Sequence, residues 1–231
     1  RLFVGHPFEK ARTLSFDKEQ VHYLRNVLRR KPGDQLRVFN GIDGEYLATL
    51  ADLSKKAGEV ILAEQIRPQP QPCRSIALVF APIKKARQDM MIEKAVELGV
   101  DIFYPVIMDH GQIHKINPDR MTKQILEAAE QCERLTIPKL SDIGPLQTCL
   151  KDISHQTDII ICVERDEAVQ VSELARDSKA RDVAIVIGPE GGLSENEIQL
   201  SRNYKAGSLG DTILRSETAA LAALSLFRLG G

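Results

Sequence analysis

Apolar residues in the second two thirds of the chain follow two alternating patterns. Short apolar runs, which predict buried strands, alternate with stretches whose apolar positions fall at helical spacing. The expected strands are 76–80, 102–107, 159–163, 183–187 and 206–209, and the expected helices are 86–98, 118–132, one near 172–176, one opening at 194–197, and 219–229. This alternation predicts an α/β domain in which helices cover both faces of a parallel sheet.

The first third of the chain shows the pattern of half-buried strands instead. Residues 35–39 and 45–50 alternate in this way across a polar turn, and 59–66 supplies another strand. One helix interrupts the strands, with Asp17 as its expected cap and Gln20 at the third position. The expected apolar stripe of this helix is Val21, Leu24, Val27 and Leu28.

A proline-rich segment separates these two regions. Pro68, Pro70 and Pro72 lie within five residues and favour extended polyproline geometry over helix or sheet pairing. We therefore expect a first domain over residues 1–67, a linker over 68–72 and a second domain over 73–231.

A glycine-rich loop, Gly188–Gly192, follows the expected strand 183–187 and precedes the capping box at 194–197. Glycines allow the backbone to approach another group closely. The loop is neither the dinucleotide fingerprint nor a phosphate-cradling loop, and Glu190 at its centre would repel a phosphate. An uncharged or cationic ligand is expected there.

A second loop with a similar plan runs from Leu209 to Ala219. Ser216 is expected to cap the helix 219–229, which is apolar nearly all round and must be buried in the core or against another subunit. The guanidinium of Arg215 lies near a packed core and needs a hydrogen-bond acceptor there. The acceptor is expected to be either a ligand or a nearby carboxylate or carbonyl. Both loops follow strands, so together they can enclose a ligand at the carboxyl ends of a parallel sheet.

The charge of the chain limits the way in which it could bind a nucleic acid. With 31 basic and 32 acidic residues the 231-residue chain has a formal charge of −1, so any nucleic-acid contact needs a local patch. Such a patch is expected at the end of the first helix, where phosphate contacts and a solvated helix face are both consistent with the spacing. Its cations are Arg25, Arg29, Arg30 and Lys31. A second basic run, Lys84–Arg87, is consistent with RNA, a ligand carboxylate or solvent.

Several other kinds of site are not expected. The four cysteines, Cys73, Cys132, Cys149 and Cys162, form no Cys-x-x-Cys pair, which favours reduced thiols in a cytoplasmic protein. His110 and His114 have helical metal spacing, but Gly111 lies between them, so no metal is expected. No membrane-spanning stretch and no nucleophile elbow is found in the sequence.

Short motifs in a fixed order give the chain a resemblance that covers nearly all of its length. The motifs are His22–Leu24 with Val27–Arg29, Glu93–Gly99, Ala128–Cys132 with Arg134 and Pro138, Gly188–Ser194 with Glu197, and Leu209–Ala219. Together they resemble the small-subunit rRNA uridine N3-methyltransferases, the RsmE family of the SPOUT class. The resemblance implies an N-terminal PUA-like RNA-binding β-barrel and a C-terminal α/β SPOUT domain with a trefoil knot. It further implies S-adenosylmethionine as methyl donor, 16S rRNA in the small ribosomal subunit as partner, and a homodimer.

The same resemblance assigns roles to residues. Arg215 would stabilise charge on the uracil, and Glu190 would orient the base, assist proton removal, lie near the sulfonium or tie the loop together. The expected cofactor-binding residues are Gly188, Pro189, Gly191, Gly192, Leu209, Gly210, Ile213, Leu214 and Thr218, and the expected RNA-binding residues are Arg1, Arg25, Arg29 and Arg30. Two alternatives stay open: an RNA ribose 2′-O-methyltransferase of the SPOUT class, and a non-catalytic RNA-binding assembly factor.

Overall fold

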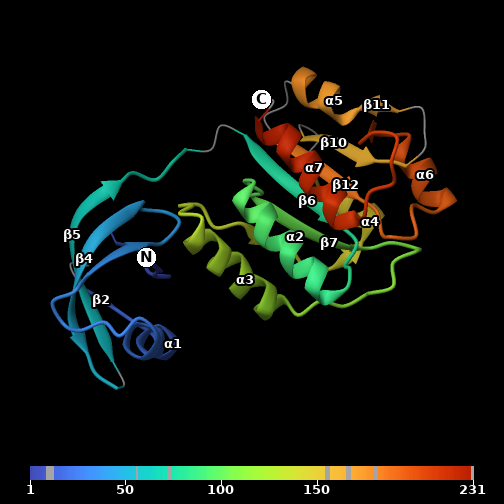
Figure 1. The fold of residues 1–231 in the computed structure, drawn as a ribbon. Coiled ribbons are helices and arrows are strands. Elements are labelled where there is room, and N and C mark those ends of the chain that lie inside the picture. The colour runs from blue at the N-terminus through green and yellow to red at the C-terminus, as the bar shows by residue number, and fades with distance from the viewer. Residues whose placement is uncertain are drawn as a thin grey trace. The chain divides into compact units, whose positions relative to one another are not determined.

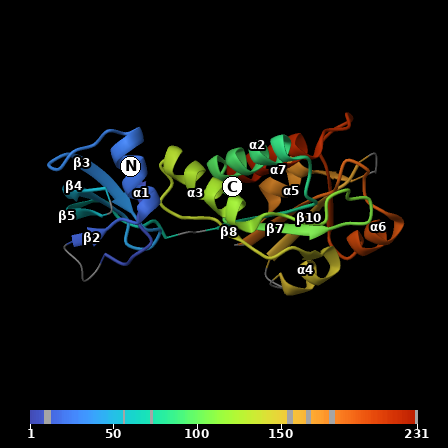
Figure 2. The ribbon, with the colours of Figure 1, turned by 90° about the horizontal axis from the view of Figure 1, so that it is seen from below.

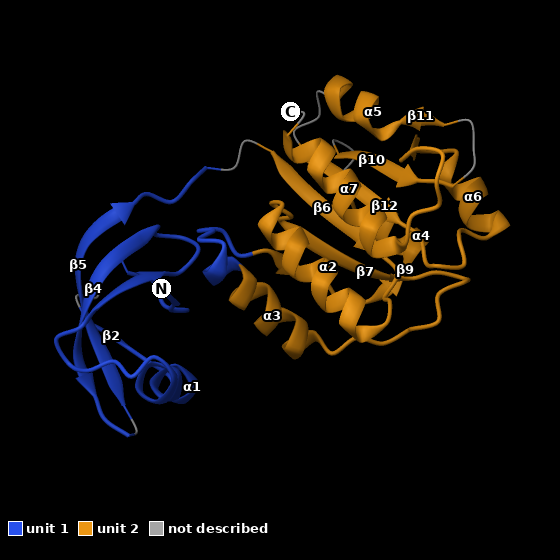
Figure 3. Ribbon diagram, in the orientation of Figure 1, with its two compact units in different colours: residues 1–71, 129–137 blue, residues 72–128, 138–231 orange. Residues whose placement is uncertain are grey.

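A computed structural model describes residues 1–8, 13–55, 57–71, 74–153, 157–164, 168–178 and 182–229. The chain forms two compact units, one of residues 1–71 with 129–137 and one of residues 72–128 with 138–231 (Figure 3). The division expected from the sequence assigned residues 129–137 to the second domain, whereas these residues pack within the first unit. Pro72 and Cys73 lie outside the described residues.

The first unit contains a five-stranded sheet in the order β1-β3-β4-β5-β2. Its strands are β1 Leu2–Phe3, β2 Thr13–Ser15, β3 Gln35–Phe39, β4 Glu45–Leu53 and β5 Gly58–Arg67. The pairings β3 with β4, β4 with β5 and β2 with β5 are antiparallel, and β1 with β3 is parallel. The strands expected at 35–39, 45–50 and 59–66 are confirmed, and the described residues show no pairing between β1 and β2.

The helix of this unit begins as the sequence predicts and ends differently. Asp17 and Gln20 form the expected capping box at the start of α1, Lys18–His22. The chain then widens into a π-helical turn, η1, Tyr23–Val27. Leu24 is fully buried, but Val27 is 59% exposed, so the expected apolar stripe is wrong beyond Leu24. The reason is that a π-turn contains an extra residue, which rotates the positions that follow it away from the core.

The second unit is built on an eight-stranded parallel sheet, drawn with its helices in Figure 1. Its strand order is β11-β13-β10-β12-β6-β7-β8, and β9 pairs with β7 off this path. The strands are β6 Ser75–Phe80, β7 Ile102–Ile107, β8 Lys139–Leu140, β9 Gly144–Pro145, β10 Thr157–Cys162, β11 Val169–Gln170, β12 Asp182–Ile187 and β13 Lys205–Ser208. The pairings between these strands are parallel, which confirms the expected sheet.

Helices cover both faces of this sheet, as expected. They are α2 Lys85–Glu97, α3 Pro118–Gln131, α4 Leu146–Asp152, α5 Val171–Asp177, α6 Glu195–Ser201 and α7 Ser216–Leu229. Figure 2 shows α2, α5 and α7 on one side of the sheet and α4 on the other. Alternate strand residues such as Val79 and Val186 pack in one cluster with Leu146 and Leu150 of α4. No helix in the described part of the chain has the length and apolar character needed to cross a bilayer.

The terminal helix α7 buries one of its faces. Ala220, Ala223, Leu224 and Phe227 are buried, and the helix contacts α2, α5 and β12. Its last residue, Leu229, is 84% exposed. The prediction that this apolar helix is buried is therefore confirmed for the face that packs against the second unit.

Candidate active site

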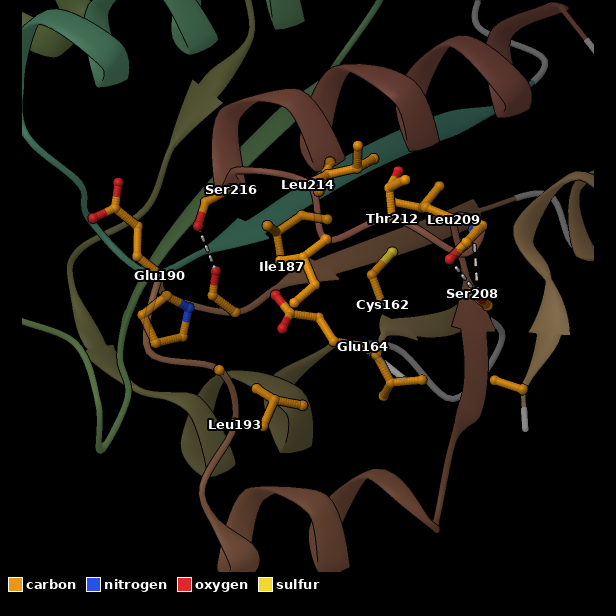
Figure 4. A pocket seen from close by; sticks show the side chains of 18 of the residues that line it. Cys162, Glu164, Ile187, Glu190, Leu193, Ser208, Leu209, Thr212, Leu214 and Ser216 are labelled. Atoms are coloured by element: carbon orange, nitrogen blue, oxygen red, sulfur yellow. Dashed lines mark hydrogen bonds between the residues drawn. The ribbon is translucent and has the colours of Figure 1, made fainter. Parts of the chain in front are cut away.

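A cavity of about 720 Å³ opens at the carboxyl ends of three neighbouring parallel strands (Figure 4). Cys162, Ile187 and Ser208, the last residues of β10, β12 and β13, all line it. This is the edge at which open α/β sheets bind ligands. The volume lies within the range of about 300–1,000 Å³ that small-molecule sites occupy.

The first wall of the cavity is the glycine-rich loop Gly188–Leu193, which follows β12. A neighbouring loop holds it: Nδ1 of His110 lies 3.1 Å from the carbonyl oxygen of Gly191 and donates to it in the Nδ1–H tautomer. A Cβ placed on Gly191 would lie 3.0 Å from the Cβ of His110. Position 191 therefore requires glycine because its backbone lies close to His110 of the same protein, and not because of a ligand.

The capping box after this loop joins the same neighbour. The Glu197 carboxylate accepts from the backbone N–H of Ser194 at 2.8 Å and from that of Asp109 at 2.9 Å. The Ser194 hydroxyl donates to Asp109 at 2.6 Å. These bonds confirm the predicted capping box and fix the C-terminal end of the glycine loop to the segment after β7.

The second wall is the loop Leu209–Leu214, between β13 and α7. The hydroxyl of Ser216 donates to the carbonyl oxygen of Gly188 across 3.0 Å, which joins the two walls. Ser216 was expected to cap the helix from outside, but it is the first residue of α7.

The lining of the cavity combines apolar side chains with polar groups, three of which are carboxylates. Glu164 and Asp211 contribute the acidic groups together with Glu190. In Figure 4 the side chain of Glu164 points in toward Ile187, whereas that of Glu190 points away from it. Carboxylates disfavour a phosphate in the cavity and favour a ligand that carries positive charge. The apolar side chains of the lining include Ile187, Leu193, Leu209, Ile213 and Leu214.

Cys162 lines the cavity as a neutral thiol. Desolvation by burial raises the pKa of the Cys162 thiol to about 12. Because a nucleophilic cysteine needs a lowered pKa, this side chain forms part of the apolar wall. The cysteine was not singled out from the sequence as a cavity residue.

A second, smaller cavity of about 320 Å³ adjoins the first. It is lined by Arg87, Glu164, Glu190, Ile213, Leu214 and Arg215, four of which also line the larger cavity. The two residues expected to act in catalysis, Arg215 and Glu190, therefore lie around one space. Arg87, from the first turn of α2, forms an ion pair with Glu190.

The structure brings together eight of the nine residues expected to bind a cofactor. They are Gly188, Pro189, Gly191, Gly192, Leu209, Gly210, Ile213 and Leu214. The ninth, Thr218, is exposed on the first turn of α7 and is not among the lining residues, although the next residue, Ala219, is. Glu164 was missed, yet it follows an expected strand just as Gly188 does, and that signal could have found it.

Three of the four arginines expected to bind RNA lie at the end of η1 in the first unit. Arg29 and Arg30 are exposed, and Arg30 has a single long salt bridge of 3.9 Å to Asp34. Arg25 is half-buried on the same turn, where the exposed apolar side chains of Tyr23, Val27 and Leu28 also lie. Cations interleaved with apolar and aromatic groups match both the phosphates and the bases of single-stranded RNA.

Arg1 is placed differently, and its expected role in RNA binding is corrected. Its side chain is only 5% exposed and forms a 2.6 Å salt bridge with the fully buried Glu45. The guanidinium also donates to the carbonyls of Ala129 and Arg134 and lies over the ring of Phe39. All of these groups belong to the first unit. Arg1 is therefore a structural residue of that unit.

His110, one member of the histidine pair, is engaged by the glycine loop. Nδ1 of His110 bonds to backbone carbonyls of the glycine loop, and the described residues contain no group of three or more ligating side chains that could hold a metal ion. The described cysteines, at positions 132, 149 and 162, are free. Cys73 lies outside the described residues.

Comparisons with known proteins agree with this geometry. Residues 69–228 match the family model of the RNA methyltransferase domain, and residues 16–63 match that of the RNA methyltransferase PUA domain. The chain is 38% identical to the ribosomal RNA small subunit methyltransferase E of Rickettsia conorii, over 91% of this chain and 87% of that protein. It is 30% identical to the protein of the same name from Synechocystis, over 97% of this chain and 76% of that protein. Among solved structures, a ribosomal RNA small subunit methyltransferase E from Neisseria gonorrhoeae bound to S-adenosyl methionine matches with a TM-score of 0.86 and 26% identity, covering 96% of this chain and 94% of that one.

Proposed function

Because the chain belongs to the ribosomal RNA small subunit methyltransferase E family, we propose that it transfers a methyl group from S-adenosylmethionine to N3 of a uridine in 16S rRNA. It is an rRNA methyltransferase with a PUA-like domain and a parallel-sheet α/β domain. The observation that carries the proposal is the cavity at the ends of β10, β12 and β13, which both predicted loops enclose.

The residues of this cavity fit S-adenosylmethionine. Its acidic lining, with Glu164 pointing inward, suits a ligand that carries a sulfonium and an ammonium group. Its apolar side chains suit the adenine ring, and the exposed backbone of two loops supplies polar groups for the ribose and the amino acid moiety. When bound, the donor supplies a methyl group that is already activated by the sulfonium.

The protein's own part in the reaction is positioning. The loops Gly188–Leu193 and Leu209–Leu214 would hold the donor beside the smaller cavity and exclude water from it. The target uracil occupies that smaller cavity, whose lining residues are shared in part with the donor site.

Arg215 and Glu190 act on the uracil from the walls of the smaller cavity. Loss of the N3 proton leaves negative charge on the ring oxygens, and the Arg215 guanidinium stabilises that charge. The Glu190 carboxylate would accept a hydrogen bond from N3–H, orient the base and receive the N3 proton, while the N3–methyl bond forms and the methyl–sulfur bond of the donor breaks.

The PUA-like unit holds the RNA through Arg25, Arg29 and Arg30. Exposed guanidinium groups contact phosphates, and the neighbouring Tyr23 and Leu28 offer stacking and apolar contacts to unpaired bases. The substrate, 16S rRNA within the small ribosomal subunit, implies that the protein acts in the cytoplasm.

Two further features of the proposal concern the second unit. A homodimer is supported by α7, whose outer face keeps partly open apolar residues and ends in the exposed Leu229. A trefoil knot is supported by the path of the chain after β13. Residues 209–215 lead from β13 past β10, which lies between β13 and β12 in the sheet, to α7, which contacts α2 and β12. Sedimentation tests the dimer by its mass, and the chain trace of a crystal structure tests the knot.

Mass spectrometry of rRNA from cells that lack the gene tests the proposed activity. Loss of one 3-methyluridine from the small-subunit RNA, restored by the intact gene, is the expected result. Loss of a 2′-O-methylated nucleoside would assign the ribose as target, and unchanged rRNA would leave a non-catalytic binding role.

A further inference from the structure

Arg87 links two segments that lie far apart in the sequence. Its guanidinium forms an ion pair with Glu190 in the glycine loop through one terminal nitrogen. Its Nε lies 3.6 Å from Oε1 of Glu217, the second residue of α7. Because these two interactions use different nitrogens of one planar group, they can exist at the same time.

The interaction with Glu217 matters because that carboxylate is buried. Its side chain is 7% exposed, and among the described residues its Oε2 has no hydrogen-bond partner. A buried carboxylate is costly unless a cation or hydrogen bonds compensate it. The N-terminus of α7 supplies part of the compensation, and Arg87 supplies an ion pair.

Of the two carboxylates, Glu190 lies in the wall of the proposed cofactor cavity, and Glu217 lies next to that wall in the sequence of α7. Glu217 follows Ser216, a lining residue whose hydroxyl bonds to Gly188 across 3.0 Å. The two loops are thus joined at two places: directly by Ser216, and through α2 by Arg87.

We propose that Arg87 is a positioning residue that holds the two cofactor loops at a fixed separation by bridging Glu190 and Glu217. This inference rests on the proposed function, since the separation matters only if both loops contact the methyl donor. Two carboxylates surround one guanidinium, so the local charge is negative. Arg87 is therefore poorly suited to bind a phosphate or a ligand carboxylate, the roles that the basic run 84–87 also allowed.

The test compares Arg87→Ala, Arg87→Lys and the control Lys85→Ala, which removes an exposed cation from the same helical turn. Calorimetry measures S-adenosylmethionine affinity, and hydrogen exchange measures the protection of the backbone amides of residues 188 and 190–193. Arg87→Ala should weaken affinity on the order of tenfold and raise exchange in the loop. Arg87→Lys should restore part of both, because one ammonium group lacks the planar fork. Lys85→Ala should change neither.

Two outcomes would overturn the inference. One is unchanged cofactor affinity and loop exchange in Arg87→Ala; the other is a loss confined to RNA affinity with a smaller salt dependence, which would make Arg87 a phosphate ligand. If Arg87→Ala does not fold, Glu190→Gln tests the same bridge from its exposed end, and unchanged loop exchange there would equally refute it. Absence of S-adenosylmethionine binding by the unaltered protein would instead refute the proposed function, while the exchange measurement without cofactor still tests the bridge.

Discussion

The Ser216 hydroxyl and the Gly188 carbonyl are joined by a 3.0 Å hydrogen bond that connects the start of α7 to the end of β12 (Figure 4). The two residues are 28 positions apart in the sequence, and Gly188 begins the glycine loop whereas Ser216 begins α7. Their bond turns two separate strand-to-helix connections into one continuous wall, so the shape of the proposed cofactor cavity depends on both loops at once.

Replacing Ser216 by Ala should weaken S-adenosylmethionine binding. The change leaves the Gly188 carbonyl without this donor, at a cost of about 1 kcal/mol, or roughly fivefold in affinity. Ser225→Ala is the matched control, because its hydroxyl bonds to the carbonyl of Leu221 within the same helix. Calorimetry on both variants checks the prediction. Equal losses of S-adenosylmethionine affinity would show that removal of any serine hydroxyl from α7 weakens binding, which would contradict a specific role for the bond to Gly188.

Replacing Gly191 by Ala should destabilise the glycine loop. The new Cβ would lie 3.0 Å from the Cβ of His110, an atom that rotation of the histidine side chain cannot move away. We expect a loss of about 1–3 kcal/mol in the free energy of unfolding, together with weaker cofactor binding. Gly144→Ala is the control, since no atom lies within 4 Å of its added Cβ. Denaturant unfolding and calorimetry measure the two effects, and an unaltered Gly191→Ala protein would contradict the described packing.

Replacing Arg215 by Ala should slow methyl transfer with little effect on RNA affinity. If the guanidinium stabilises charge on the uracil, its loss should raise the barrier by about 2–4 kcal/mol, by analogy with deleted oxyanion donors. Single-turnover methylation of saturating small-subunit RNA measures this barrier, and Arg215→Lys should recover only part of the rate. A normal rate at saturation would remove Arg215 from the chemistry.

The exposed and the buried arginines of the first unit should behave differently. Converting Arg29 and Arg30 to Ala should weaken RNA binding and lower its salt dependence by about one unit of slope for each phosphate that the variant no longer binds. Arg1→Ala should instead destabilise the unit by about 3 kcal/mol, since it removes a close partner of the buried Glu45. Filter binding at several salt concentrations and denaturant unfolding separate the two effects. Lys18→Ala, an exposed cation at the start of α1, controls for charge.

The longer elements of the fold were predictable because their signals are local. The strands at 35–39 and 102–107 were expected at the bounds that the structure gives, since their apolar residues alone specify a half-buried or buried strand. Strands β8 and β9, of two residues each, carry no such signal, because they exist only through parallel pairing with β7. The short helix α4 was missed in the same region.

The residues of the candidate site also fall into those that the sequence predicted and those that only the fold reveals. The two glycine-containing loops could be found because each follows an apolar strand, and ligands bind at strand carboxyl ends. Glu164 gave the same signal, since it follows the expected strand 159–163, but only the fold shows that β10 lies beside β12 with Cys162 opposite Ile187. Arg1 and Arg87 gave misleading signals, because their partners Glu45, Glu190 and Glu217 are distant in sequence and only the fold brings them together.

Reconstitution of the reaction tests the proposed methyl transfer to uridine N3. Small ribosomal subunits from a strain that lacks the gene are incubated with the purified protein and S-adenosylmethionine, and the methylated nucleoside is identified by mass spectrometry. We expect 3-methyluridine at a single position of the 16S rRNA, formed only when the donor is present. A 2′-O-methylated nucleoside, or no methylated nucleoside from protein that binds the donor, would contradict the proposal.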